Sequence, residues 1–158
     1  MKKLYSLALE QKEDSKHGDS FFPIQRYITT LDNNYPVVTA HWHEEAELTM
    51  ITSGFCKYQI DLVDFDVECT EKMVSDTYVF HLNFLGGNST DICSTRYLTP
   101  MMNQEFSMPH LITPKHPAYA SLKTIFTQIN HLYDEAIPGY ELAIKAMLLQ
   151  VCFLLIQY

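Results

Sequence analysis

The stretch "HWHEEAELTMITSG", residues 41–54, decides the predicted fold. It places His41 and His43 two positions apart, with a carboxylate at Glu47 and a glycine at Gly54. On a strand, residues two apart point to the same side, so both imidazoles are expected on one face. Two histidines and one carboxylate on one face can hold a divalent metal ion, and the same groups can hydrogen-bond a polar ligand.

The composition narrows the class of protein. The chain has 158 residues, 47% of them hydrophobic, which suits one globular domain. The formal net charge is −8 and no Lys/Arg cluster is visible, so a nucleic-acid surface is not expected. The N-terminus lacks the apolar run of a signal peptide, and the four cysteines form no CxxC pair. We therefore expect a cytoplasmic protein with reduced thiols.

The first half of the chain shows strand periodicity. Residues 36–43 and 47–53 are rich in β-branched residues, and apolar and polar side chains alternate in residues 56–61 and 63–68. A period of two predicts half-buried β-strands. Residues 76–85 are more continuously apolar, which predicts a strand buried on both sides.

The second half shows helical periodicity. From Pro117 onward apolar residues recur every three or four positions, which predicts an amphipathic helix ended by Ile-Pro-Gly at 137–139. A second helix is predicted for residues 140–158. Between residues 146 and 156 only Gln150 is polar.

A helix that is apolar on nearly all sides needs cover on all sides. An uncovered second face would forgo about 1.5–3 kcal/mol for each large side chain left in water. We therefore expect a homodimer through the C-terminal helices, and the alternative is a helix buried within its own chain. A membrane helix is not expected, because the apolar run is short. Strands followed by a helical pair predict a small antiparallel barrel or sandwich with helices at one end.

The opening stretch resembles the first cupin motif: His-x-His, three residues, Glu, six residues, Gly. The motif also has a glycine six positions before the first histidine, where this sequence has Tyr35. The wider context resembles the N-terminal halves of AraC/XylS-type transcriptional regulators. The segments that carry this resemblance, in order, are "KEDSKHGDSFFPIQRY" (12–27), "HWHEEAELTMITSG" (41–54), "VFHLNFLGG" (79–87), "RYLTP" (96–100) and "PGYELAIKAMLLQ" (138–150).

The resemblance implies a mainly β chain with C-terminal helices: a cupin, jelly-roll-like barrel followed by an antiparallel helical pair. It implies an N-terminal arm at residues 1–20, the barrel at 21–115 and a helical dimerisation segment at 116–158. In such regulators two helix-turn-helix units follow and bind DNA through the major groove. We expect these units to lie outside this chain, so that DNA is a partner only through them.

One part of the family pattern is missing. After a strand such as "DFDVE" (64–68) the family continues with another strand, a turn and a histidine, whereas here "CTEKMVSD" (69–76) follows directly. We expect a strand–turn–strand unit of about 10–20 residues to be lacking near Glu68–Cys69. A true deletion would open the barrel and leave strand edges unpaired. The alternative, which we favour, is that the sequence leaves residues out at this junction.

The predicted ligand-binding residues are His41, His43, Glu47, Tyr58 and His81. Tyr58 alternates with polar neighbours, so its ring is expected to point inward. His81 lies in the most apolar strand, where the alternative role is that of a core histidine. Trp42 is expected to face the other way and to pack on the outside of the wall. A small polar effector, for example a sugar, fits such a pocket.

Metal ligation by His41, His43 and Glu47 is the alternative use of the motif. The fourth ligand of a metal cupin falls in the missing unit and His81 does not align with it, so we expect no cofactor. The remaining histidines are predicted to be solvated: His17, His110, His116 and His131.

Three functions stay open at this point. The leading hypothesis is an effector-sensing and dimerisation domain of a transcriptional regulator, without enzyme activity, in which the bound molecule shifts the population of conformations. The second is a metal-dependent cupin enzyme, such as an oxygenase or an isomerase, that uses His41, His43 and Glu47. The third is a dimerisation module that binds no ligand.

Overall fold

The structure is a computed structural model that describes residues 15–32, 41–54, 58–60, 63–65, 72–86, 91–106 and 108–158. The chain divides into two compact units, Met1–His81 and Leu82–Tyr158. Each unit is described by itself.

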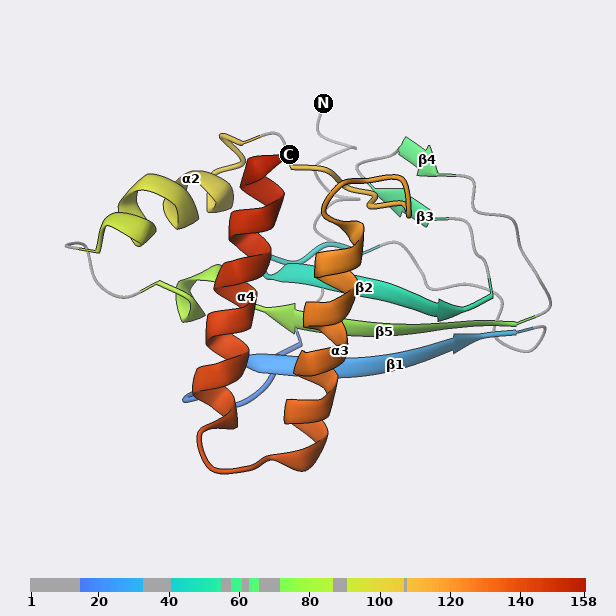
Figure 1. The fold of residues 1–158 in the computed structure, drawn as a ribbon, viewed down its shortest axis with the longest axis horizontal. Helices are drawn as coiled ribbons and strands as arrows, with labels where there is room; N and C mark the ends of the chain where they lie inside the picture. The colour runs from blue at the N-terminus through green and yellow to red at the C-terminus, as the bar shows by residue number, and fades with distance from the viewer. Residues whose placement is uncertain are drawn as a thin grey trace, which may run out of the picture. The chain divides into compact units, whose positions relative to one another are not determined.

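The first unit is built around a three-stranded antiparallel sheet (Figure 1). Its strands are β1 (Ile24–Leu31), β2 (Ala46–Ser53) and β5 (Met73–Phe80). β5 lies between the other two, so the strand order is β1-β5-β2. Two short strands, β3 (Tyr58–Ile60) and β4 (Val63–Phe65), form a separate hairpin.

The predicted cupin barrel is wrong. In the described part of the chain the strands form an open sheet with β1 and β2 at its edges, and the helices outweigh the strands, so the fold is α/β. A closed barrel needs every edge strand to pair with another strand. The described residues between 82 and 106 form η1 (Leu82–Phe84), η2 (Ser94–Leu98), α2 (Thr99–Met102) and turns, and contribute no strand that could help to close a barrel. The Glu68–Cys69 junction lies outside the described residues.

The predicted doubly buried strand is β5. Its side chains are buried on both faces from Ser75 to Phe80. The strand ends at Phe80, earlier than the apolar run suggested, because a 3-10 helix, η1 (Leu82–Phe84), follows. Burial on both faces fits a central strand with a neighbour on each side.

The register sorts the side chains of the sheet into two faces. One face, named the apolar face, consists of Ile24, Arg26 and Ile28 of β1, Asp76, Tyr78 and Phe80 of β5, and Ala46, Leu48 and Met50 of β2. The other, named the polar face, consists of Gln25, Tyr27 and Thr29 of β1, Ser75, Thr77 and Val79 of β5, and Glu47, Thr49 and Ile51 of β2. Ser75 and Thr77 are buried although their side chains are polar. Buried hydroxyl groups therefore mark the polar face.

Gly54 ends β2 where the chain passes close to its own backbone. Its φ is +72°, and a Cβ at this position would lie 2.0 Å from the carbonyl oxygen of Lys72. Only glycine can combine this left-handed conformation with so close an approach. The glycine of the opening motif is thus explained by a turn in an open sheet.

The second unit begins with an irregular helical segment. The π-helix η2 (Ser94–Leu98) leads directly into α2 (Thr99–Met102). Asp91 caps the segment, since its Oδ1 accepts from the Cys93 N–H at 3.0 Å and its Oδ2 from the Ser94 Oγ–H at 2.7 Å. Pro100 has no N–H and its ring clashes with the carbonyl of a regular helix four residues earlier. The wider π turn, in which the Thr99 N–H donates to the Ser94 carbonyl, accommodates it.

Two long helices occupy the ranges in which a helical pair is expected. They are α3 (Tyr119–Glu135) and α4 (Tyr140–Gln157), which run antiparallel side by side (Figure 1). Ala136 and Gly139, both in the left-handed region, form the tight turn between them. The buried side chains of α3 are Ile125, Phe126 and Ile129, at steps of one, three and four, as an amphipathic helix requires.

Candidate functional site

A row of hydroxyl groups crosses the polar face at its centre. Tyr27 of β1 and Thr49 of β2 are both direct cross-strand neighbours of Thr77 on β5. The Oγ1 atoms of Thr49 and Thr77 lie 2.9 Å apart, within hydrogen-bond distance. Thr77 is buried, Thr49 is half-buried and Tyr27 is exposed, so the row runs from the interior of the sheet to its surface.

The hydrogen bonds of this row have a fixed direction. The Thr49 hydroxyl donates to Oε1 of Glu47 at 2.8 Å, which commits its single hydrogen. The hydrogen of the Thr77–Thr49 bond must therefore come from Thr77. The chain of donation runs from Thr77 through Thr49 to the Glu47 carboxylate.

His43 extends this chain toward the edge of the sheet. Its Nδ1 lies 3.1 Å from the carbonyl oxygen of Glu45, so Nδ1 carries a hydrogen, because a carbonyl only accepts. Its Nε2 lies 3.5 Å from Oε2 of Glu47, longer than a direct hydrogen bond. The His43 side chain is 10% exposed and that of Glu47 is 36% exposed. Solvent therefore reaches the site through the side chain of Glu47 rather than that of His43.

His17 completes the group from outside the sheet. Its Nδ1 lies 2.9 Å from the Tyr27 hydroxyl, and its ring stands edge-on to the Tyr27 ring. The His17 and His43 ring centroids are 5.8 Å apart. His17 is only 8% exposed, and its Nε2 is buried with no hydrogen-bond partner. A buried polar atom without a partner costs about 1–3 kcal/mol.

A preformed turn holds His17 in this place. The carboxylate of Asp19 accepts hydrogen bonds from the N–H groups of Phe21 and Phe22 at 2.7 and 2.8 Å. These bonds hold the pKa of Asp19 below its usual value. Gly18 has φ +76°, and a Cβ there would lie 2.5 Å from the Ile24 nitrogen. The turn brings the chain back along β1, so that residue 17 reaches Tyr27.

The structure brings together three of the five predicted ligand-binding residues. His41, His43 and Glu47 lie close together, with the His41 and His43 rings 5.7 Å apart and tilted by 33°. His41 is exposed. The backbone of Tyr58 belongs to β3, but its side chain lies outside the described part. His81 follows the last residue of β5 and is half-buried.

Other residues of the site are absent from the sequence prediction. They are His17, Tyr27, Thr49 and Thr77. The prediction that His17 is solvated is wrong, because this residue is buried. The sequence does contain a signal for it, since Gly-Asp at 18–19 is a turn pair that can fold the chain back. His110 and His131 are exposed, as predicted, whereas His116 is half-buried beside Tyr158.

The metal alternative does not fit the geometry. Among the residues that the structure describes, no group of three or more His, Cys, Asp or Glu side chains is arranged to hold a metal ion. His41, His43 and Glu47 lie near one another but do not form such a group. Ligation by these three residues is therefore not supported.

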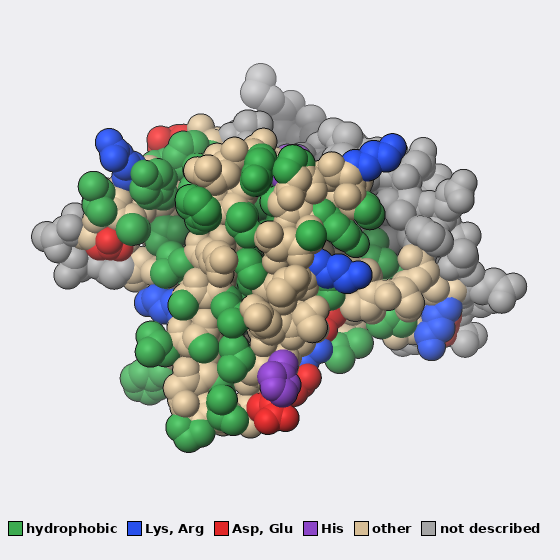
Figure 2. All heavy atoms as spheres, viewed as in Figure 1, with side chains coloured by type: hydrophobic (Ala, Val, Ile, Leu, Met, Phe, Trp, Pro, Cys, Tyr) green, Lys and Arg blue, Asp and Glu red, His purple; other side chains and the backbone are tan. Residues whose placement is uncertain are grey.

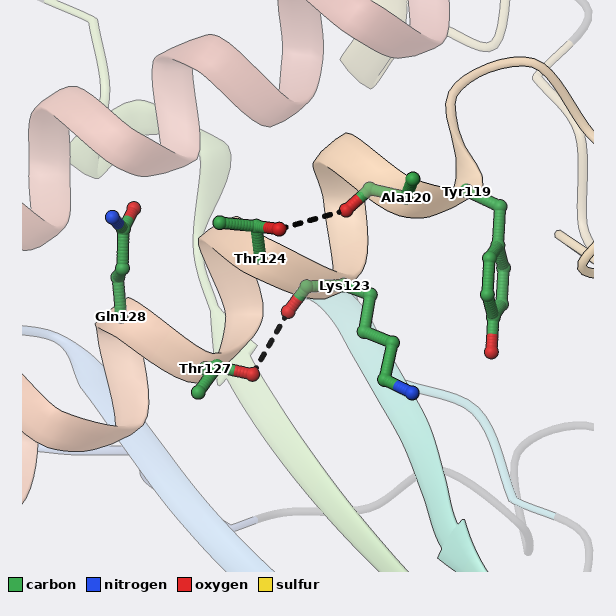
Figure 3. A pocket seen from close by; sticks show the side chains of 6 residues that line it. All are labelled: Tyr119, Ala120, Lys123, Thr124, Thr127 and Gln128. Carbon is green, nitrogen blue, oxygen red and sulfur yellow. Dashed lines mark hydrogen bonds between the residues drawn. The ribbon is translucent and has the colours of Figure 1, made fainter.

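Two shallow hollows lie on the second unit. The larger, about 420 Å³, is lined by Tyr119, Ala120, Lys123, Thr124, Thr127 and Gln128 (Figure 3). Thr124 and Thr127 direct their hydroxyls to the carbonyls of Ala120 and Lys123 in their own helix. These hydroxyls are already paired, and the hollow is shallow, so it makes a poor binding site.

The polar face gathers several groups that can hydrogen-bond a ligand. It combines imidazoles, hydroxyls and a carboxylate, half-buried and hydrogen-bonded to one another. Comparison of the chain with protein-family models, curated proteins and solved structures gave no match. The site geometry and the sequence motifs therefore carry the functional inference.

Proposed function

We propose that this chain is the effector-sensing and dimerisation part of a transcriptional regulator of the AraC/XylS type, which binds a small polar molecule at the polar face. The observation that carries the proposal is the buried, unpartnered Nε2 of His17. A bound molecule with a hydrogen-bonding group would satisfy this atom, and its binding would gain the free energy that the orphan nitrogen otherwise costs.

The site residues come from two separate segments of the chain, which suits a sensing role. His17 comes from the segment before β1, while His43 and Glu47 flank the start of β2. A ligand that contacts all three binds best when the N-terminal segment is docked on the sheet. Such a ligand shifts the population toward that conformation, because its affinity differs between the docked and undocked states.

The dimerisation part of the proposal rests on α4. Its buried side chains are Ile144, Leu148, Val151 and Cys152. A second apolar stripe has the heptad spacing of four, three, four and three residues: Leu142, Ala146, Leu149, Phe153 and Ile156. Leu142 is 75% exposed and Phe153 is 57% exposed. In Figure 2 hydrophobic side chains lie exposed along α4.

The two stripes lie on different sides of the helix. At about 100° per residue, the second stripe is centred roughly 135° away from the buried one. Inside its own unit the helix therefore buries the first stripe and leaves the second exposed or half-buried. A second copy of the chain would cover the exposed heptad stripe, as in a coiled coil.

The sizes of the side chains indicate how two copies meet. If two α4 helices run antiparallel about a twofold axis at Leu149, Ala146 of one copy faces Phe153 of the other. Leu142 then faces Ile156. A small residue opposite a large one fills space without a clash, whereas a parallel pair would place Phe153 against itself.

A membrane is the rival partner for this helix. α4 is long and apolar enough, by length and composition, to cross a membrane. Three of its polar residues, Glu141, Lys145 and Gln150, lie within the first three turns, and the first two would place a charge pair in lipid. The heptad stripe, in contrast, is free of polar residues along its full length, which favours a protein partner.

The ligand part is tested by thermal unfolding of the purified protein with a panel of sugars, polyols, amines, amino acids, organic acids and metal salts. At least one class should raise Tm in the wild type and not in His17→Ala or His43→Ala, because binding to the native state alone stabilises it. His131→Ala, an exposed change on α3, is the matched control. If no compound raises Tm in the wild type, the sensing proposal is wrong.

A further inference from the structure

We infer that the molecule bound at the polar face carries adjacent hydroxyl groups and no negative charge. This inference rests on the proposed function and adds the chemical class of the ligand. Some hydrogen-bonding atoms of the site already have partners, and the atoms that remain open define the ligand.

Glu47 and His43 each have one atom committed and one atom open. Oε1 of Glu47 accepts from Thr49, and Nδ1–H of His43 donates to the carbonyl of Glu45. The open atoms are Oε2 of Glu47 and Nε2 of His43, which lie 3.5 Å apart. On a neutral His43 both open atoms carry lone pairs and no hydrogen.

A ligand that satisfies these two adjacent acceptor atoms must carry two adjacent hydrogen-bond donors. A vicinal diol supplies them, since one hydroxyl can donate to Oε2 of Glu47 and the next to Nε2 of His43. A carboxylate or phosphate brings further lone pairs and a like charge next to Glu47, which is unfavourable in a half-buried site.

His17 favours a hydroxyl as well. If the Tyr27 hydroxyl donates to Nδ1 of His17, the open Nε2 carries a hydrogen; if Tyr27 accepts, Nε2 carries a lone pair. A ligand hydroxyl satisfies either form, because it both donates and accepts. An ammonium group satisfies only the second form, and a carboxylate only the first.

The charges around the site point the same way. Among the described residues no contact joins a Lys or Arg side chain to His17, His43 or Glu47. The guanidinium of Arg26 is paired with Asp76 on the opposite face of the sheet. An anionic ligand would therefore lack the cationic partner that such ligands usually have.

Matched pairs of compounds test the inference by calorimetry. The pairs are D-glucose with D-glucuronate, D-galactose with D-galacturonate and D-ribose with D-ribonate, alongside putrescine and ZnCl₂ as non-hydroxyl probes. We expect a neutral member to bind at least about tenfold more tightly than its acid, and Glu47→Gln to weaken it about tenfold or more. His17→Asn, which keeps a donor and an acceptor, should retain more affinity than His17→Ala. Circular dichroism shows whether each variant is folded, and His131→Ala is the control.

The other results separate the two proposals. Tighter binding of the acids, or binding of putrescine or Zn²⁺ alone, would overturn the inference and leave the sensing function in place. If none of the compounds of either experiment binds, the sensing function fails and this inference with it. A ¹⁵N–¹H spectrum that places no hydrogen on Nδ1 of His43 would overturn the inference without any ligand.

Discussion

Arg26 and Asp76 form a bidentate ion pair within the apolar face of the sheet. Nε of Arg26 donates to Oδ1 of Asp76 at 2.8 Å, and Nη2 donates to Oδ2 at 2.5 Å. The two side chains are 13% and 6% exposed. The guanidinium also lies over the Tyr78 ring, 5.9 Å from its centroid. The pair joins β1 to β5 diagonally, since Arg26 is directly opposite Tyr78 and Asp76 opposite Ile28.

Breaking this pair on one side should destabilise the protein strongly. Arg26→Met leaves the Asp76 carboxylate buried without its partner, which costs about 3–5 kcal/mol. Arg26→Met combined with Asp76→Leu should recover a large part of that loss, because no charge is then left buried. Urea unfolding measures both variants. A double variant as unstable as the single one would show that the pair acts through more than its charges.

The turn at Gly54 should not tolerate a side chain. Gly54→Ala places a Cβ 2.0 Å from the Lys72 carbonyl oxygen and strains the backbone at φ +72°. Gly139→Ala is the matched control, since Gly139 also has positive φ but has nothing within 4 Å of its Cβ position. We expect a loss of about 1 kcal/mol for the control and at least about 2–3 kcal/mol for Gly54→Ala, measured by thermal unfolding. Equal losses would contradict the close approach.

The buried thiol of Cys152 should lower the free energy of unfolding at alkaline pH. Burial raises the pKa of Cys152 to about 11 from its ordinary value of 9.0. The stability it contributes is therefore complete below pH 9 and is lost as the pH rises toward 11, by about 2–3 kcal/mol. Chemical unfolding at intervals between pH 8 and 11 measures the slope, and Cys152→Ala should flatten it. Iodoacetamide followed by peptide mass spectrometry should modify the exposed Cys93 well before Cys152.

The heptad stripe on α4 should control the oligomeric state. Leu142→Glu and Phe153→Glu each place charges at the proposed interface and should convert a dimer to a monomer in sedimentation velocity. Thr127→Glu on the exposed side of α3 is the control. A wild-type protein that sediments as a monomer at micromolar concentration would refute the dimer.

Cysteine crosslinking distinguishes the two directions in which α4 helices can pair. With the twofold axis at Leu149, Leu149→Cys should form an intermolecular disulfide under oxidation, whereas Leu142→Cys should not, since it lies far from its own copy in an antiparallel pair. Non-reducing electrophoresis in a Cys93→Ser background gives the result. Crosslinking of both variants would indicate parallel helices.

The turn at Asp19, which places His17 beside Tyr27, should weaken at acidic pH. Because the two N–H groups of Phe21 and Phe22 lower the pKa of Asp19, the turn is favoured above the unfolded-state value of 3.8 and is weakened as the pH falls through the lower folded-state value. Asp19→Ala should loosen the turn at all pH values. The measurement is the NMR chemical shift of the Tyr27 ring, which faces His17. An unchanged shift in the variant would show that Gly18 alone sets the turn.

Local features of the fold were predictable from the sequence. The helical periodicity locates α3 and α4, and the apolar run of residues 76–85 contains most of β5, because burial imposes these patterns within a single element. The spacing of His41 and His43 likewise predicts that they share one side. Such arguments depend only on neighbours along the chain.

Closure of the sheet and the full site were not predictable in this way. The barrel depended on pairing between distant strands, and nothing in the periodicity of β1 or β2 says whether an edge is covered. The apolar run 82–85 suggested a continued strand, yet it forms η1. His17 lies between Lys16 and Gly18 in a polar stretch, and such a sequence predicts a solvent-exposed side chain. Only the tertiary contact with Tyr27 makes it part of the site.

If α4 mediates the proposed dimer, its two apolar stripes link assembly to folding. In the proposed dimer, α4 would supply apolar side chains to its own unit and to a second copy, so that the two cores would share a single element. The melting temperature of the chain should then rise with its concentration, because mass action drives both processes through the same helix. A rotation or local unfolding of α4 would then change the packing of its own core and the contact with the partner copy together.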